Sequence, residues 1–228
     1  MDYPLALALV DFLPVLAMAA GIALLVPYVG LASGRFAGRV ALAGGTMVVL
    51  GGALKAVWKL LVAAGGPDVA WLAGVQFFLF GPGFALLAWA ALSVRRTGAA
   101  LSSARAGAPL WALASFAGAG VVAALLAGAT WPLLLVTTVC ATILGVRLLL
   151  LSRHPAGRSL FGFNLLGTYT MGLLASRPEQ TIALQWAEET LNTLTWAAFA
   201  LAVWRLSWES ASADDRPEPT GETSSPRH

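Results

Sequence analysis

Long apolar runs alternate with short polar stretches along almost the whole chain. About 20 apolar residues are enough to cross the hydrocarbon core of a bilayer as an α-helix, and seven runs reach that length or come close to it. The predicted helices cover residues 4–29, 40–64, 69–94, 108–129, 131–152, 159–176 and 178–208. The pattern therefore predicts an all-α polytopic membrane protein, folded as a bundle of seven transmembrane helices.

The pattern changes sharply near the C-terminus. Residues 209–228 consist mainly of Asp, Glu, Pro, Ser, Thr and Arg. Such a segment has too little apolar surface to offset the entropy cost of ordering it. We therefore expect one membrane domain over residues 1–208 and a disordered cytoplasmic tail over residues 209–228.

Composition agrees with a membrane protein and excludes several classes of function. Hydrophobic residues make up 58% of the chain and charged residues only 11%, whereas soluble domains carry about 25% charge. The net charge of +3 comes from arginines near helix ends, so it does not indicate nucleic-acid binding. One cysteine, Cys140, and two histidines, His154 and His228, exclude a disulfide framework and a paired-histidine haem site. We expect no cofactor.

The arginines indicate how the chain is oriented in the membrane. Loops after the first, third and fifth helices, together with the end of the seventh, hold most of them: Arg35, Arg39, Arg95, Arg96, Arg105, Arg153, Arg158 and Arg205. The opposite side holds only Arg177, beside Asp2, Asp68 and Glu179. Because basic residues stay on the cytoplasmic side, we expect a multi-pass protein of the cell membrane with its N-terminus outside and its C-terminus inside.

Two segments suggest an internal repeat. Residues 84–89 (FALLAW) resemble residues 199–204 (FALAVW), and both lie at the cytoplasmic end of their helices. Helices one to three and five to seven would then be parallel repeats joined by the fourth helix, a 3+1+3 arrangement. This layout resembles that of the SWEET and PQ-loop transporters. Where those families carry a Pro-Gln pair, this chain has Leu13-Pro14-Val15 and Trp131-Pro132-Leu133, so the resemblance concerns the layout alone.

The last predicted helix carries a polar stripe. Thr181, Gln185, Glu188, Asn192 and Thr195 follow one another at steps of four, three, four and three, which places them on one helix face. A carboxylate at membrane depth costs about 2.5–3.5 kcal/mol on insertion scales. The stripe must therefore face other parts of the protein or water.

Ionisable and amide side chains from four helices share the outer half of the predicted bundle. They form our candidate site for a polar ligand, an ion or a proton: Asp11, Lys55, Lys59, Gln76, Gln185, Glu188, Glu189 and Asn192. The chain has only two lysines, and both belong to this set. Three acids and two lysines leave one negative charge, and burial favours neutralising one carboxylate by a proton. We predict that Lys55 pairs with Glu188 or Asp11.

Simpler interpretations of the same residues remain open. Lys59 could extend its ammonium to the outer surface, and a pair between Lys55 and Glu188 could serve helix packing alone. The amides are also groups that form hydrogen bonds between membrane helices. The sequence favours a transporter for a small solute, coupled to protons, with the lipid bilayer as its surroundings. The alternatives are a seven-helix sensor or receptor, a structural membrane subunit and, with least support, a membrane enzyme.

Overall fold

All regular structure in the described part of the chain is α-helical. The computed structural model describes residues 4–94, 109–175, 177 and 181–214, and no strand occurs among them. The helices are α1 (Leu5–Val10), α2 (Phe12–Ser33), α3 (Arg35–Ala63), α4 (Ala70–Ser93), α5 (Leu110–Ala127), α6 (Trp131–Leu151), α7 (Pro155–Ala175) and α8 (Ile182–Asp214). The all-α prediction is confirmed, and α1 and α2 together correspond to the first predicted helix.

Two helix boundaries differ from the predicted ones in an informative way. α3 begins at Arg35 and not near residue 40, because the single residue Gly34 connects it to α2. Gly34 has a φ of 92°, a left-handed conformation that glycine adopts without steric cost. At the other end of the chain, α8 continues through residue 208 to Asp214. Part of the predicted tail is thus helical, and residues 215–228 lie outside the described residues.

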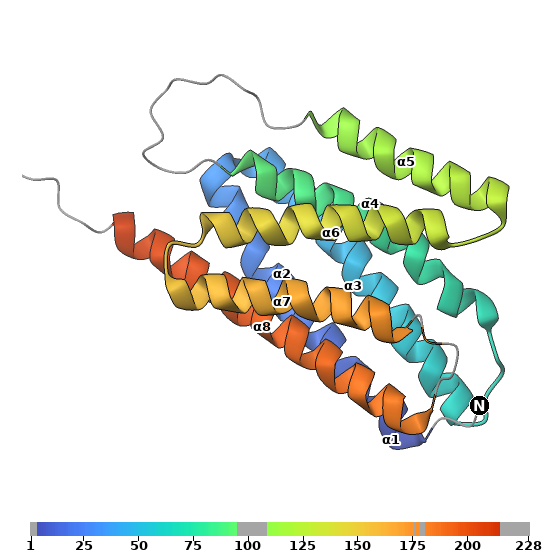
Figure 1. The fold of residues 1–228 in the computed structure, drawn as a ribbon. Helices are drawn as coiled ribbons and strands as arrows, with labels where there is room; N and C mark the ends of the chain where they lie inside the picture. The colour runs from blue at the N-terminus through green and yellow to red at the C-terminus, as the bar shows by residue number, and fades with distance from the viewer. Residues whose placement is uncertain (1–3, 95–108, 176, 178–180, 215–228) are drawn as a thin grey trace, which may run out of the picture.

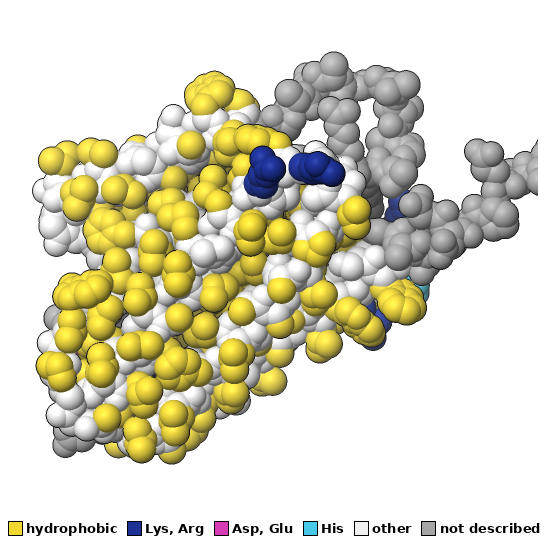
Figure 2. Space-filling view, turned by 180° about the vertical axis from the view of Figure 1, so that it is seen from behind, with side chains coloured by type: hydrophobic (Ala, Val, Ile, Leu, Met, Phe, Trp, Pro, Cys, Tyr) yellow, Lys and Arg dark blue, Asp and Glu magenta, His cyan; other side chains and the backbone are white. Residues whose placement is uncertain are grey.

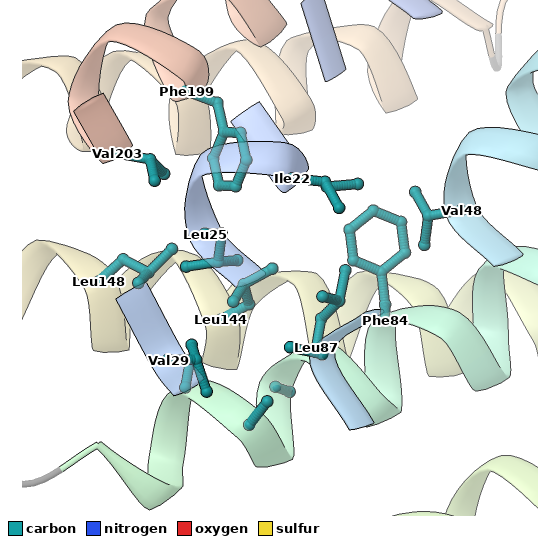
Figure 3. Close-up of a cluster of buried hydrophobic side chains, with 14 of the residues drawn as sticks. Ile22, Leu25, Val29, Val48, Phe84, Leu87, Leu144, Leu148, Phe199 and Val203 are labelled. Carbon is teal, nitrogen blue, oxygen red and sulfur yellow. The ribbon is translucent and has the colours of Figure 1, made fainter. Parts of the chain in front are cut away.

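Six long helices form a ring around an apolar core, and one helix lies outside it. Going round the ring, α2 packs on α3, α3 on α4, α4 on α6, α6 on α7, α7 on α8 and α8 on α2. α5 packs only against α4 and α6 and lies at the edge of the bundle (Figure 1). The core fills the centre of the ring with side chains such as Ile22, Phe84, Leu144 and Phe199, which point into one space (Figure 3).

Glycines allow the closest approaches between ring helices. A Cβ atom added to Gly44 of α3 would lie 2.7 Å from the carbonyl oxygen of Gly83 on α4, which is too close for any side chain. A Cβ atom on Gly167 of α7 would lie 2.1 Å from Oγ1 of Thr195 on α8. α4 remains one continuous helix through the Gly81-Pro82-Gly83 segment.

The outer wall of the bundle is apolar, as a bilayer requires. Large hydrophobic side chains are strongly exposed on several helices, including Leu31, Leu126 and Leu166, and apolar side chains cover the face seen in Figure 2. Among the residues that the structure describes, five helical segments are long and apolar enough to cross a membrane: Leu5–Ser33, Arg35–Ala63, Trp71–Ser93, Leu110–Ala127 and Trp131–Leu151. The protein is therefore of the membrane-embedded type. α7 and α8 are long but more polar, so a bundle with seven spans stays a prediction.

Polar contacts connect neighbouring helices at the arginine-rich end of the bundle. Arg147 of α6 donates hydrogen bonds from its guanidinium to the backbone carbonyls of Ala91, at 3.4 Å, and of Val94. These carbonyls lie at the C-terminal end of α4, where the carbonyl of Ala91 also accepts a hydrogen bond from the backbone N–H of Val94. Glu209 of α8 accepts a hydrogen bond of 3.1 Å from the backbone N–H of Arg153. Residue 209 is therefore part of the folded bundle.

Candidate functional site

Asp11 occupies the junction between α1 and α2. The proline ring of Pro14 cannot donate a backbone hydrogen bond and would clash with the carbonyl of Val10, four residues earlier. α1 accordingly ends at Val10, and α2 starts at Phe12. The side chain of Asp11 is buried, with 4% of its surface exposed, and points into the bundle.

Lys59 joins Asp11 to the last helix. Its Nζ atom lies 2.8 Å from Oδ1 of Asp11 and 2.7 Å from Oε1 of Glu189. We call these three residues the ion cluster. Lys59 belongs to α3 and Glu189 to α8, so the ion cluster connects the α1–α2 junction with two other helices. Both contacts have the short distances of charge-assisted hydrogen bonds.

The ion cluster holds more acid than base. Asp11 and Glu189 both contact the one ammonium group of Lys59, so two buried carboxylates share a single cation. Burial disfavours an unmatched charge, which favours a proton on one of the two carboxylates. With that proton, the ion cluster is electrically neutral, and without it the charge is −1. The geometry therefore provides a place for one exchangeable proton.

A cavity of about 110 Å³ adjoins the ion cluster. Asp11 and Glu189 form part of its wall, and Lys55, Gln76 and Asn192 add polar groups from α3, α4 and α8. We call this space the outer cavity, after the outside position that the arginine distribution predicts for this end of the bundle. A water molecule accounts for about 30 Å³ of liquid, so the outer cavity has room for a few waters or for a ligand with a few heavy atoms.

Lys55 contributes the second positive charge. It lies one turn before Lys59 on α3, lines the outer cavity and interacts electrostatically with Glu189. Within the part of the chain that the structure describes, no carboxylate lies within salt-bridge distance of its ammonium group. The ammonium can therefore serve a ligand in the outer cavity.

Aromatic side chains bound the outer cavity on the side of the apolar core. Phe80 and Phe84 of α4 and Trp196 of α8 line it. The rings of Phe84 and Trp196 stack with centroids 6.3 Å apart, and Trp196 meets Phe199 edge to face at 5.5 Å. Phe84 and Phe199 belong to the core cluster (Figure 3). These rings separate the polar space from the packed interior.

The level of the ion cluster follows from the length of α3. This helix has 29 residues and is about 43 Å long, which exceeds the hydrocarbon thickness of about 30 Å. Lys59 lies ten residues from the middle of α3, or about 15 Å along the axis. The ion cluster thus lies near one boundary of the hydrocarbon core, and Lys55 lies closer to the centre.

The predicted pairing of Lys55 with Glu188 or Asp11 is wrong. Lys59 holds Asp11, and its second partner is Glu189. Neighbouring residues of a helix point about 100° apart, and the face of α8 turned towards the ion cluster carries Glu189. The surface position considered for Lys59 is also wrong, because only 9% of its side chain is exposed.

Two predicted site residues lie outside the outer cavity. Gln185 is buried on α8, one turn before Glu189. Glu188 shares a helix face with Thr195, which packs against Gly167 of α7. The buried Oε1 atom of Glu188 has no hydrogen-bond partner among the described residues. The remaining predicted residues either form the ion cluster or line the outer cavity: Asp11, Lys55, Lys59, Gln76, Glu189 and Asn192.

The aromatic rings that bound the outer cavity were not among the predicted site residues. These rings follow the polar residues at helical spacing, since Phe80 and Phe84 come four and eight residues after Gln76, and Trp196 comes four residues after Asn192. Helix periodicity alone would have placed them on the same faces.

Comparison with known proteins gives no lead on function. The chain matches no family model, no curated protein and no solved structure. Among the described residues, no group of three or more His, Cys, Asp or Glu side chains is arranged to hold a metal ion. The chemistry of the site has to be inferred from its own residues.

Proposed function

We propose that the protein is a proton-coupled transporter of a small polar solute, with α7 and α8 completing seven membrane spans. The N-terminus would lie outside and the arginine-rich end in the cytoplasm, which places the outer cavity in the outer half of the membrane. The observation that carries this proposal is that two buried carboxylates, which share one lysine, form part of the wall of a polar cavity. A purely structural clasp would match its charges and would leave no polar space beside them.

The charges suggest how proton and solute would be coupled. When the ion cluster holds its proton, it is neutral, and the ammonium of Lys55 is available to a solute. When the proton leaves, the charge of the ion cluster becomes −1 and attracts Lys55, which interacts with Glu189. A proton on the ion cluster and a negatively charged group beside Lys55 would therefore favour each other's binding.

The size and lining of the outer cavity limit the solute. Drug-sized ligands occupy pockets of about 300–1,000 Å³, and the outer cavity offers about 110 Å³. The amides of Gln76 and Asn192 both donate and accept hydrogen bonds. These groups together with Lys55 favour a solute of a few heavy atoms that carries a carboxylate or a similar polar group.

The arrangement of the ring supports the 3+1+3 repeat as part of this proposal. Rotating the ring by half a turn exchanges α2 with α6, α3 with α7 and α4 with α8. After this rotation, every pair of packed helices coincides with another packed pair. The α2–α3 pair coincides with α6–α7, the α3–α4 pair with α7–α8, and the α8–α2 pair with α4–α6. Parallel repeats that rock against each other would place their shared site inside such a ring.

A sensor that binds its ligand from outside is the second candidate. It is favoured by the tight apolar packing between the outer cavity and the arginine-rich end, where Leu25, Leu87 and Leu148 are almost completely buried. A sensor would keep this packing closed, whereas a transporter has to open it in each cycle. Movement of protons or solute across the membrane therefore distinguishes the two.

Proton flux into sealed vesicles tests the proposal. The protein would be reconstituted into liposomes containing a pH-sensitive dye and subjected to an inward proton gradient, with and without a panel of small carboxylates. We expect faster acidification with at least one carboxylate, and its loss in Glu189→Gln. Glu188→Gln is the matched control, because Glu188 does not line the outer cavity. If wild-type vesicles acidify no faster than empty ones across the panel, the transporter proposal fails.

A further inference from the structure

A membrane-facing groove between α2 and α3 lies apart from the outer cavity. It encloses about 360 Å³ and is lined by apolar and small side chains, including Ala19, Ala23 and Val26 of α2 and Leu42, Thr46 and Val49 of α3. Ala23, Leu42 and Thr46 are exposed. The groove is thus open on the outer wall of the bundle, where lipid surrounds an embedded protein.

Two arginines continue the same face of α3 beyond one end of the groove. Arg35, Arg39, Leu42, Thr46 and Val49 follow one another at steps of four, three, four and three, which places them along one side of the helix. Both arginines are exposed. In Figure 2, basic side chains stand towards one end of a face that apolar side chains otherwise cover. The α2–α3 groove is therefore apolar along its length, a part that we call the trough, and it has two positive charges at one end.

The start of α3 adds to the attraction for an anion. Gly34 precedes the helix and provides no side-chain cap, so the first backbone N–H groups of α3 are not satisfied by a capping side chain. Aligned peptide dipoles make such an end positive and suited to phosphate. Arg35 and Arg39 lie in the first two turns of α3. Both cations and the positive end of the helix dipole therefore lie at the same end of α3.

The dimensions match one leaflet of a membrane. Eleven residues separate Arg39 from Leu50, the last groove residue of α3, which corresponds to about 16 Å along the helix. Half of the hydrocarbon core measures about 15 Å. A chain that starts at the headgroup level near Arg39 would thus reach the middle of the bilayer where the α2–α3 groove ends.

We propose that the α2–α3 groove binds one anionic phospholipid. Its phosphate would lie against Arg35, Arg39 and the start of α3, and one acyl chain would lie along the small side chains of the trough. The positive charges of the two arginines favour an anionic headgroup over a zwitterionic one, and the apolar lining of the trough binds the acyl chain. This inference requires only that the protein is embedded in a membrane, so it stands whether or not the outer cavity transports anything.

Native mass spectrometry of the purified protein tests the lipid site. The probes are phosphatidylglycerol and phosphatidylcholine with identical acyl chains. We expect one tightly held phosphatidylglycerol and weaker phosphatidylcholine. A basic residue near an anionic membrane surface strengthens binding about fivefold, so Arg35→Gln with Arg39→Gln should weaken phosphatidylglycerol binding by about 30-fold. The matched control is Arg153→Gln with Arg205→Gln, which removes two exposed arginines at the same end.

A second pair of variants tests the trough. Ala23→Trp would fill the groove from an exposed position and should reduce binding of both lipids. Ala119→Trp makes the same change on the exposed wall of α5 and should leave binding unchanged. Equal affinity for the two lipids, or binding unaffected by both the arginine and the Ala23 variants, would overturn the proposal. A protein dimer that disappears in Ala23→Trp would also overturn it, because a second copy would then occupy the groove.

Discussion

The side chains of Lys59 and Glu189, which lie 130 positions apart in the chain, meet with 2.7 Å between Nζ and Oε1. The same ammonium group holds Asp11 at 2.8 Å. One lysine thus connects the beginning of the chain with its last helix, inside the bundle and beside a polar cavity. The ion cluster can stabilise the fold and bind a proton, and the two roles respond differently to substitution.

Replacing Lys59 should destabilise the fold strongly. Lys59→Met would leave Asp11 and Glu189 buried without their cation, and breaking a buried ion pair in this way costs about 3–5 kcal/mol. Lys55→Met is the control, since Lys55 lines the outer cavity and forms no ion pair within the described residues, and it should cost less than about 1 kcal/mol. Unfolding of the purified protein in mixed micelles by increasing denaturing detergent would measure both. Equal effects would contradict the assignment of the cation to Lys59.

The contact between Lys59 and Glu189 should appear as a coupling in a double-mutant cycle. Residues in one ion-pair network show coupling energies of about 0.5–3 kcal/mol. We expect a value in this range for Lys59→Met combined with Glu189→Gln. Lys55→Met combined with Glu188→Gln should give almost none, because the described part of the structure has no ion pair between these two residues. The same unfolding experiment supplies all the values, and coupling in the second pair alone would contradict the structure.

Close packing of α3 on α4 should make Gly44 intolerant of a methyl group. The added Cβ atom would lie 2.7 Å from a backbone oxygen of Gly83, which cannot rotate away. Overpacking of this kind costs about 1–3 kcal/mol. Gly118→Ala on α5 is the control, since a Cβ atom there meets nothing within 4 Å. That change should be neutral or stabilising, because alanine favours helices. Thermal unfolding would show whether the two variants differ as expected.

Arg147 should stabilise the bundle through the end of α4. Its guanidinium donates hydrogen bonds to backbone carbonyls at the C-terminal end of α4, and a hydrogen bond from a charged group contributes about 1.5–3 kcal/mol. Arg147→Met should therefore cost about 2 kcal/mol. Arg205→Met removes an exposed arginine at the same end and should change stability little. Similar losses in both variants would mean that the guanidinium contacts contribute nothing specific.

Apolar periodicity was sufficient to predict the helices, because the bilayer imposes their length and each helix satisfies its own backbone hydrogen bonds. The periodicity predicted that the second helix starts at residue 40, because Arg39 resembled a loop residue. The helix starts at Arg35 instead. One glycine at position 34 completes the turn, and α3 carries its arginines within its first turns. The end of α8 was predicted too early for a related reason: Glu209 is charged but is bonded within the bundle.

The candidate site was predicted as a set of residues but not as a set of contacts. Intramembrane charges are conspicuous in a sequence, so Asp11, Lys59 and Glu189 were all in the set. Which lysine meets which acid depends on the rotation and axial offset of three helices, and one turn of α3 separates Lys55 from Lys59. Sequence spacing fixes the relative direction of residues within one helix. It does not fix the offset between helices.

Access of water to the outer cavity is the final prediction, because both proton exchange and solute binding depend on it. Asn192→Cys would place a thiol in the wall of the outer cavity, and a membrane-impermeant thiosulfonate added from the side opposite the arginine-rich end should label it. Ala198→Cys, deeper on the same helix and buried, should resist the reagent. The natural Cys140 is fully buried and gives a low background.

The charge of the reagent adds a second readout. The ammonium of Lys55 should make a negatively charged thiosulfonate react faster than a positively charged one, and Lys55→Met should remove that preference. If Asn192→Cys and Ala198→Cys prove equally unreactive from both sides, the outer cavity does not communicate with water, and the ion cluster is a structural clasp.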